Sequence, residues 1–91
     1  MQFEWDPDKD RRNQAKHGVS FAEANTIFGD PLAWTVRDPD HSTGERRFLT
    51  TGYSKNQRLI IVAHAERGDR IRIISARDVT AAERRIYEEG E

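Results

Sequence analysis

Two apolar runs rich in β-branched residues follow each other between positions 57 and 79, and they form the most regular pattern in the chain. A polar connection, Glu66-Arg67-Gly68-Asp69, separates them. Two such runs around a short connection that contains glycine are typical of a β-hairpin. Apolar residues occupy both faces of each run. This predicts strands that lie in the middle of a sheet and not at its edge.

A first helix is expected between Pro7 and His17. Asp6 is a favourable N-cap, proline is favoured at the first helical position, and Gly18 suits the left-handed residue after a helix end. The helix has almost no apolar face, since one side of it carries a polar stripe at helical spacing. The stripe consists of Lys9, Asn13, Lys16 and His17. It is either a solvated wall or a basic rim beside a phosphate-binding groove. In the second case Lys9, Lys16 and His17 bind the substrate.

Two more helices are marked by capping boxes, in which a serine or threonine is followed three residues later by glutamate. The boxes begin at Ser20 and Thr80, and Gly29 ends the earlier helix. Alternating or apolar segments predict further strands at 3–5, 32–36 and 45–54. The order of elements predicts an α+β fold in a single domain, residues 1–91. We expect a mainly antiparallel sheet with two N-terminal helices and a short C-terminal helix.

Composition narrows the class of protein. The 91 residues carry a formal net charge of -1, with 35% hydrophobic and 34% charged residues. The core is therefore modest, which favours either marginal stability or a partner that covers part of the surface. The absence of cysteine excludes disulfides and thiolate chemistry and fits a reducing compartment. No apolar segment approaches the roughly 20 residues of a membrane span, and the N-terminus does not resemble a signal peptide. We therefore expect a cytoplasmic protein that does not contact membranes.

One polar loop groups side chains that could bind a metal ion. Asp38, Asp40, His41 and Glu45 supply carboxylates and an imidazole within eight positions. Their spacing matches no established metal motif, and acidic residues are common in loops. The chain also has no phosphate-binding glycine loop of the Walker or dinucleotide type. We therefore expect neither a metal ion nor another cofactor.

Several cations interrupt the apolar hairpin, namely Arg67, Arg70, Arg72 and Arg77, with His64 on the neighbouring strand. A buried guanidinium without a partner is costly, so these side chains must reach a partner, solvent or a ligand. The guanidinium fork matches the geometry of phosphate, which favours phosphate recognition. A surface ion pair with a nearby acidic residue is the alternative for each arginine.

Arg47, His64, Arg72, Arg77 and Tyr87 together suit RNA cleavage that uses the RNA's own 2′-hydroxyl as nucleophile. Arginines would stabilise the charged phosphorane, His64 would act as base or acid, and Tyr87 would stack on a base or donate a proton. A structural role inside the apolar strand is the alternative for His64. On strict alternation Arg72 and Arg77 point to opposite faces. They share one site only if a bulge or a strand end intervenes.

Two motifs, KHGV at 16–19 and RIISAR at 72–77, occur here in a specific order and spacing. They are accompanied by Phe3-Glu4-Trp5-Asp6, Lys9, Asn13, Ser20-Phe21, Glu23-Ala24, Asp30-Pro31, Arg47-Phe48, Glu66-Arg67-Gly68-Asp69, Glu83 and Tyr87. In this combination nearly the whole chain resembles the BrnT toxins of bacterial type II toxin–antitoxin systems.

The resemblance implies a RelE-like fold, a ribonuclease activity that arrests translation, and a BrnA-type antitoxin encoded by a neighbouring gene. Such antitoxins carry a ribbon-helix-helix region, so operator DNA would be contacted only through the antitoxin. Together with the cations described above, the resemblance leads us to expect a metal-independent endoribonuclease. In this hypothesis RNA is bound by Lys9, Lys16, His17 and Arg67. The competing hypothesis is a non-catalytic subunit whose arginine surface holds an acidic partner or DNA. An RNA degradation assay separates the two.

Overall fold

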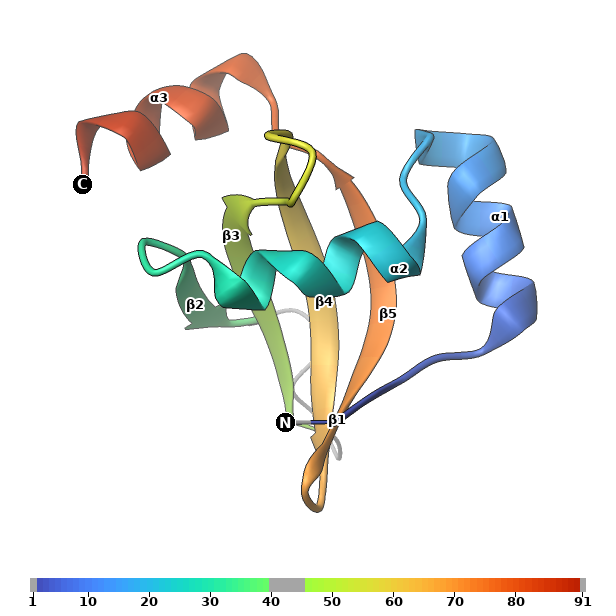
Figure 1. The fold of residues 1–91 in the computed structure, drawn as a ribbon. Helices are drawn as coiled ribbons and strands as arrows, with labels where there is room; N and C mark the ends of the chain where they lie inside the picture. The colour runs from blue at the N-terminus through green and yellow to red at the C-terminus, as the bar shows by residue number, and fades with distance from the viewer. Residues whose placement is uncertain (1, 40–45, 91) are drawn as a thin grey trace.

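A computed structural model describes residues 2–39 and 46–90 of the chain. Its centre is one five-stranded sheet in which β1 and β2 are the outer strands, in the order β1-β5-β4-β3-β2 (Figure 1). The strands are β1 (Gln2–Glu4), β2 (Trp34–Arg37), β3 (Arg47–Tyr53), β4 (Leu59–Arg67) and β5 (Arg70–Asp78). The neighbours from β2 to β5 pair antiparallel, whereas β1 pairs parallel with β5. The fold is therefore α+β with a mixed sheet, and the central hairpin predicted from the sequence is confirmed.

The helices lie on different sides of this sheet. They are α1 (Pro7–His17), α2 (Phe21–Ala24), the 3-10 helix η1 (Asn25–Gly29) and α3 (Ala81–Glu89). In Figure 1, α2 and η1 cross one face of the sheet, α1 stands beside β5, and α3 extends away from the end of β5. None of the helices in the described part of the chain is long and apolar enough to cross a membrane.

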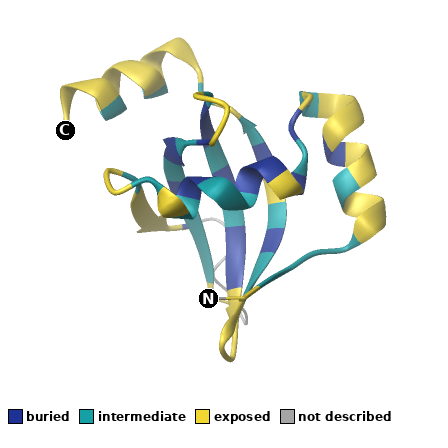
Figure 2. Ribbon diagram, viewed as in Figure 1, coloured by how far each residue is buried: buried dark blue, intermediate teal, exposed yellow. Residues whose placement is uncertain are grey.

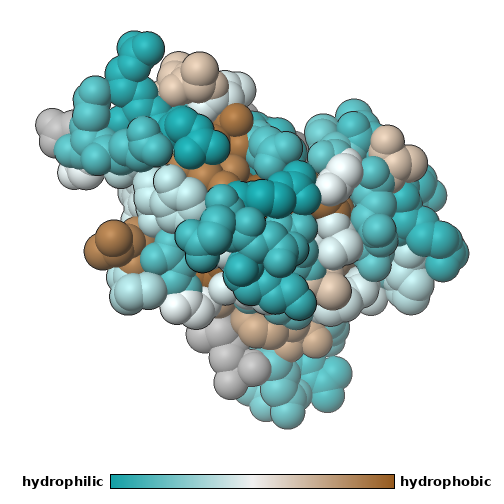
Figure 3. All heavy atoms as spheres, turned by 45° about the horizontal axis from the view of Figure 1, so that its top comes forward, coloured by the Kyte–Doolittle hydropathy of each residue, from teal (hydrophilic) through white to brown (hydrophobic). Residues whose placement is uncertain are grey.

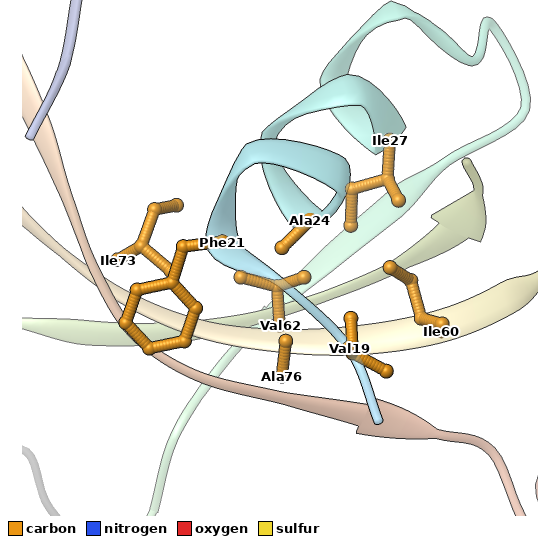
Figure 4. Close-up of a cluster of buried hydrophobic side chains, with 8 residues drawn as sticks. All are labelled: Val19, Phe21, Ala24, Ile27, Ile60, Val62, Ile73 and Ala76. Atoms are coloured by element: carbon orange, nitrogen blue, oxygen red, sulfur yellow. The ribbon is translucent and has the colours of Figure 1, made fainter. Parts of the chain in front are cut away.

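The hydrophobic core lies between α2 and η1 and the sheet face that they cover. Phe21, Ala24 and Ile27 pack against strand residues such as Val62 and Ile73, and all of them are almost completely buried (Figure 4). Burial of each of the larger side chains contributes about 1.5–3 kcal/mol. Figure 2 shows the burial concentrated on β4, β5 and α2, while α3 and the outer side of α1 are largely exposed. This core holds the sheet in one fixed orientation.

Asn13 joins α1 to the free edge of β5. Its side chain donates to the carbonyl oxygen of Ala76 at 2.8 Å and accepts from the backbone N–H of Ala76 at 3.1 Å. It also donates to the carbonyl oxygen of Val19. A buried backbone edge must find such partners, and here one side chain takes the place of a neighbouring strand. The polar stripe of α1 is thereby fixed next to β5.

The helix ends largely follow the sequence signals. Asp6, Ser20 and Thr80 cap the N-termini of α1, α2 and α3 through their side chains, and Gly18 ends α1 with a φ of 69°. Only Thr80 forms the reciprocal capping box with its glutamate. The carboxylate of Glu23 instead accepts from Ser54 and Arg58. The second predicted helix is also shorter than expected, because it is one α-helical turn that continues as the 3-10 helix.

The sheet departs from the sequence expectation at its margins. The strand expected at 32–36 begins only at Trp34, because Asp30 accepts from the backbone N–H of Leu32 and forms a turn there. The parallel pairing of β1 with β5 was not predicted. It joins the first strand of the chain to the last and places Glu4 beside Arg72. Of the described helices, α3 is the one that lies against the sheet face opposite α2 and η1, near one end of that face.

Candidate active site

Two arginines flank a small residue on the sheet face that α2 and η1 leave uncovered. Arg47 of β3 is the register partner of Ala65 of β4, and Ala65 is the partner of Arg72 of β5. Register partners project from the same face of a sheet, and neighbouring strands are roughly 5 Å apart. The Cα atoms of Arg47 and Arg72 are therefore roughly 10 Å apart, across a side chain that consists of one methyl group. Ala65 is fully buried, so a ligand at this point would meet the arginine side chains and not the sheet itself.

A β-bulge brings Arg77 to the same face as Arg72. Ala63 pairs with Ser75, but the next residue along β4, His64, pairs with Ile73. Ile74 is thus an extra residue in β5, and it shifts the alternation of side chains by one position. Without it Arg72 and Arg77 would point to opposite faces, as strict alternation predicts. The bulge that a shared arginine surface requires is therefore present.

Glu4 at the parallel edge balances part of this positive charge. Its carboxylate oxygens lie 3.4 Å from guanidinium nitrogens of Arg70 and Arg72, and 4.0 Å from one of Arg67. These distances are longer than the 2.7–2.9 Å or so of a strong charge-assisted hydrogen bond. One carboxylate thus serves three guanidinium groups.

Arg77 is held more tightly than the other arginines. It donates two hydrogen bonds to the Glu83 carboxylate, at 2.8 and 3.0 Å, and one to the carbonyl oxygen of Asp78. The hydrogen bond from Arg77 lowers the pKa of Glu83 to about 2, and the same bond raises the pKa of Arg77 above its usual value. This ion pair ties the first turn of α3 to β5.

Tyr87 follows Glu83 by four residues, about one turn further along the same face of α3, and performs a similar tethering role. Its hydroxyl donates to the carboxylate of Asp30 at 2.9 Å, and its ring meets Tyr53 edge to face. Burial, together with the bond to Asp30, raises the pKa of Tyr87 to about 12. Such a hydroxyl is a weak proton donor at neutral pH. The structure does not bring it next to the Arg47 and Arg72 pair.

His64 lies on the opposite face of the sheet from the arginines. It is 4% exposed, its ring meets Phe28 edge to face and stacks on Phe48, and its Nε2 is 2.7 Å from the hydroxyl of Thr50. Burial lowers the pKa of His64 to about 4, so the ring is neutral at pH 7. Its Nδ1 has no hydrogen-bond partner among the described residues. The sequence interpretation grouped His64 with the arginines, and the structure separates them.

The basic stripe of α1 forms one wall of an open groove beside the bulge. Lys9, Lys16 and His17 line it together with Arg12, and Ile74 and Ser75 of β5 form its floor. Ser75 is exposed and lies on the arginine-bearing face, as the partner of Ala63. The groove therefore connects α1 with the face that carries Arg72 and Arg77. The structure brings Lys9, Lys16 and His17 to one place, as the sequence predicts.

The metal hypothesis finds no candidate in the part of the chain that the structure describes. Within residues 2–39 and 46–90, no cluster of three or more histidine, aspartate or glutamate side chains could hold a metal ion. Asp38 is described and buried, whereas Asp40, His41 and Glu45 lie outside the described residues.

A family model described as "Ribonuclease toxin, BrnT, of type II toxin-antitoxin system" matches residues 5–83. The chain belongs to the BrnT family. The match includes Arg47, Arg72 and Arg77 and ends before Tyr87. The resemblance seen in the sequence motifs is thereby confirmed, and with it the identity of the chain as a ribonuclease toxin with an antitoxin partner.

The crystal structure of the Brucella abortus ribonuclease toxin BrnT has a similar fold, with a TM-score of 0.65. The alignment covers 88% of this chain and 97% of that one, at 24% sequence identity. At this identity the similarity concerns the fold alone. No similar sequence was found among curated proteins.

Two features of this surface were missed by sequence reasoning. One is Glu4, whose position among the arginines depends on the parallel pairing of β1. The other is an apolar groove between Trp34 and Ile86, next to Arg77. The alternation in 34–36 does place Trp34 and Val36 on one face, so half of the second feature could have been recognised. Its other half comes from α3, whose position depends on tertiary contacts.

Proposed function

We propose that this BrnT protein is an endoribonuclease that cleaves RNA through the RNA's own 2′-hydroxyl and without a metal ion, thereby arresting translation. The observation that carries the proposal is the pair of guanidinium groups, Arg47 and Arg72, on either side of Ala65. They project from the sheet face opposite α2 and η1, and in the proposal one phosphodiester bridges the two side chains. Arginine is well suited to phosphate because its planar guanidinium group can donate two parallel hydrogen bonds to two phosphate oxygens.

In the proposed reaction the 2′-oxygen attacks the adjacent phosphorus, and the bond from phosphorus to the 5′-oxygen breaks. The products are a 2′,3′-cyclic phosphate and a 5′-hydroxyl end, whose oxygen takes its proton from solvent water. The phosphorane carries more negative charge than the phosphodiester, and fixed donors aimed at this charge lower the barrier. Arg47 and Arg72 supply these donors. Glu4, next to Arg72, is the carboxylate positioned to accept the proton of the 2′-hydroxyl.

Arg77 contributes a phosphate contact in this proposal. A guanidinium has five N–H donors, and the three bonds to Glu83 and Asp78 leave two of the five outside the contacts described here. Arg77 lies five positions from Arg72 along β5, or roughly 15 Å. It therefore meets a different phosphate of the strand. We leave His64 out of the reaction, since it is buried on the other face.

The substrate path continues over the edge of the sheet. Lys9, Lys16 and His17 line the groove beside Ser75, and Arg67 lies at the opposite end of β4 and β5. Cations spaced along a groove bind the phosphate backbone without regard to sequence. We propose that these four residues hold the RNA on both sides of the cleaved bond.

Partner and location follow from the same activity. An enzyme that stops translation acts in the cytoplasm, and a BrnA-type antitoxin neutralises it there by covering the arginines. Operator DNA is contacted by the antitoxin and not by this chain. The RelE-like arrangement implied by the resemblance is also part of the proposal. It is supported by the antiparallel order of β2 to β5 and by the position of the helices before the sheet strands.

The proposal is tested with purified variants and a defined single-stranded RNA. Arg47→Ala and Arg72→Ala should each lower the cleavage rate by about 10²–10³-fold, the usual loss when one fixed donor to a developing charge is removed. Lysine should rescue poorly at both positions, because it lacks the planar fork. The control is Arg11→Ala, an exposed arginine of α1 paired with Asp8 and not part of the groove. Unchanged cleavage by both alanine variants would remove these arginines from the site.

The chemistry of the ends separates this mechanism from metal-dependent cleavage and from a non-catalytic subunit. Cleavage should continue in EDTA and leave 2′,3′-cyclic phosphate or 3′-phosphate ends. Loss of activity in EDTA with recovery in magnesium would contradict the mechanism and return attention to Asp38 and its loop. Binding of RNA with no product at any enzyme concentration would favour the non-catalytic hypothesis.

A further inference from the structure

One surface carries every large hydrophobic side chain that is exposed in the described part of the chain. These residues are Leu32, Trp34, Val36 and Ile86, with exposed fractions of 77%, 43%, 42% and 47%. Leu32, Trp34 and Val36 lie on β2 or just before it, and Ile86 lies on α3. Single exposed apolar residues are ordinary, whereas a group of them on an otherwise charged surface marks a place of interaction.

The group surrounds a groove on the same sheet face as the arginines. The groove has a volume of about 170 Å³, and its walls include Trp34, Val36, Leu49, Ile61 and Ile86. In Figure 3 hydrophobic surface, drawn in brown, is visible beside the C-terminal helix within a surface that is largely hydrophilic. Thr51 and Glu83 are the polar residues of the lining, and Glu83 is already bonded to Arg77.

The chemistry of the groove favours a protein segment over an RNA base. A base binds by stacking on an aromatic face and by hydrogen bonds from its edge. Among the described residues that line the groove, only Trp34 offers such a face. The other exposed members are aliphatic, as expected where a partner buries apolar side chains in the centre of an interface.

The position of the groove adds a charge requirement. Ile61, in its floor, is the register partner of Arg77, and Arg72 lies on the same face further along β5. A segment that fills the groove and continues along the sheet therefore meets guanidinium groups. Acidic side chains next to its apolar ones would complement them.

We propose that this groove is the anchoring site of the antitoxin, which inserts apolar side chains between Trp34 and Ile86 and covers the arginines with acidic residues. The proposal rests on the function proposed above. It assigns the two effects of the antitoxin to different residues. The groove supplies affinity, and the acidic residues over Arg72 and Arg77 supply inhibition. A toxin with an altered groove should therefore remain an active ribonuclease that its antitoxin no longer controls.

The test uses the antitoxin from the same operon, and calorimetry measures its dissociation constant for the toxin. The double variant Trp34→Ser with Val36→Ser should bind it at least about 30-fold more weakly, the change expected for a central anchor residue. Ile86→Ser should act in the same direction from α3, which guards against a local defect in β2. Lys55→Ala, an exposed residue in the turn between β3 and β4, is the surface control and should bind normally. Thermal unfolding confirms that each variant is folded.

RNA cleavage by the free variants and their sedimentation complete the experiment. The groove variants should cleave RNA at the wild-type rate and should escape inhibition in cells. Wild-type affinity for the antitoxin would overturn the proposal. Cleavage lost with antitoxin binding retained would assign the groove to RNA, and a wild-type dimer that the variants abolish would assign it to a second copy of the chain. Absence of cleavage by the wild-type protein would contradict the proposed function alone, because calorimetry still reports on the groove.

Discussion

At the scale of single residues, His64 shows how burial decides a role. Its ring stacks on Phe48 and lies 2.7 Å from the Thr50 hydroxyl, which in turn lies 2.7 Å from the hydroxyl of Thr35. The Thr50 bond satisfies one ring nitrogen, and the sheet itself stands between the ring and the arginines. A neutral imidazole of this kind fills the core. It cannot take a proton from a substrate on the other face.

The lowered pKa of His64 predicts a loss of stability in mild acid. The folded protein binds the proton with a pKa of about 4, whereas the unfolded chain binds it near the ordinary 6.5. The unfolded state therefore binds more protons between these values, and stability falls as pH decreases from about 6.5 to 4. The total effect is at most about 3 kcal/mol, since each pKa unit corresponds to about 1.4 kcal/mol. Urea unfolding at several pH values measures it.

His64→Leu is the variant that isolates this contribution. It loses the bond to Thr50 and is expected to be less stable than the wild type at pH 7. Its stability should nevertheless change less between pH 6.5 and 4. Parallel curves for the two proteins would show that His64 is not the group responsible. RNA cleavage by the variant, measured where it is folded, should persist.

At the scale of elements, α3 depends on a few polar contacts. None of its residues is buried, and it is tied to the rest of the fold by Glu83 through Arg77 and by Tyr87 through Asp30. A helix of nine residues is marginal in water without tertiary contacts. The position of α3, and with it one wall of the apolar groove, therefore relies on these tethers and on a longer hydrogen bond, 3.4 Å, from the Tyr53 hydroxyl to Glu88.

Glu83→Gln should loosen α3 in a pH-dependent way. The pKa of Glu83 is lowered to about 2 in the folded protein from an ordinary value of 4.5. Its stabilising effect is therefore complete above pH 4.5 and is lost as pH falls through 2. The difference in stability between the wild type and Glu83→Gln should be largest near neutral pH and shrink toward pH 2. A constant difference would mean that the carboxylate charge is not what holds the helix.

The elements also show which parts of the site could be predicted from sequence. Features that depend only on residues close in the sequence were predicted. They are the hairpin, the caps at Asp6 and Thr80 and the polar stripe of α1. The bulge at Ile74 was not predicted, because it exists only in the register between β4 and β5. The faces of His64 and Arg77 depend on that register. Glu4 likewise reached its place through the parallel pairing of β1.

At the scale of the whole molecule, the net charge does not reflect how the charges are distributed over the surface. The formal net charge is -1, yet cations follow one another from the groove of α1 over Ser75 to Arg72 and Arg47. An RNA strand can follow this path with its backbone. Affinity for RNA should therefore depend strongly on salt, because each neutralised phosphate releases counterions.

The double variant Lys9→Ala with Lys16→Ala measures this path. The slope of log affinity against log salt concentration should decrease in magnitude by about 1.4, or about 0.7 for each single-strand phosphate contact that is lost. Lys55→Ala, an exposed lysine in the turn between β3 and β4, is the control and should leave the slope unchanged. Equal slopes for all three proteins would show that α1 is a solvated wall, the alternative left open by the sequence.

The arrangement of the two surfaces on one sheet face predicts that RNA and antitoxin exclude each other. The apolar groove lies next to Arg77, and Arg72 lies further along the same face, so a partner that is anchored at Trp34 and Ile86 and continues along the sheet covers the position where the phosphate binds. Binding should be competitive: the apparent affinity for RNA should keep falling as the antitoxin concentration rises, without reaching a plateau. Titration of antitoxin into a complex with RNA that carries a 2′-O-methyl group at the cleaved position measures this. Two outcomes would contradict this: an apparent RNA affinity that falls only to a plateau at high antitoxin concentration, or simultaneous binding with no loss of RNA affinity. Either would show that the antitoxin acts through a change in conformation and not by covering the site.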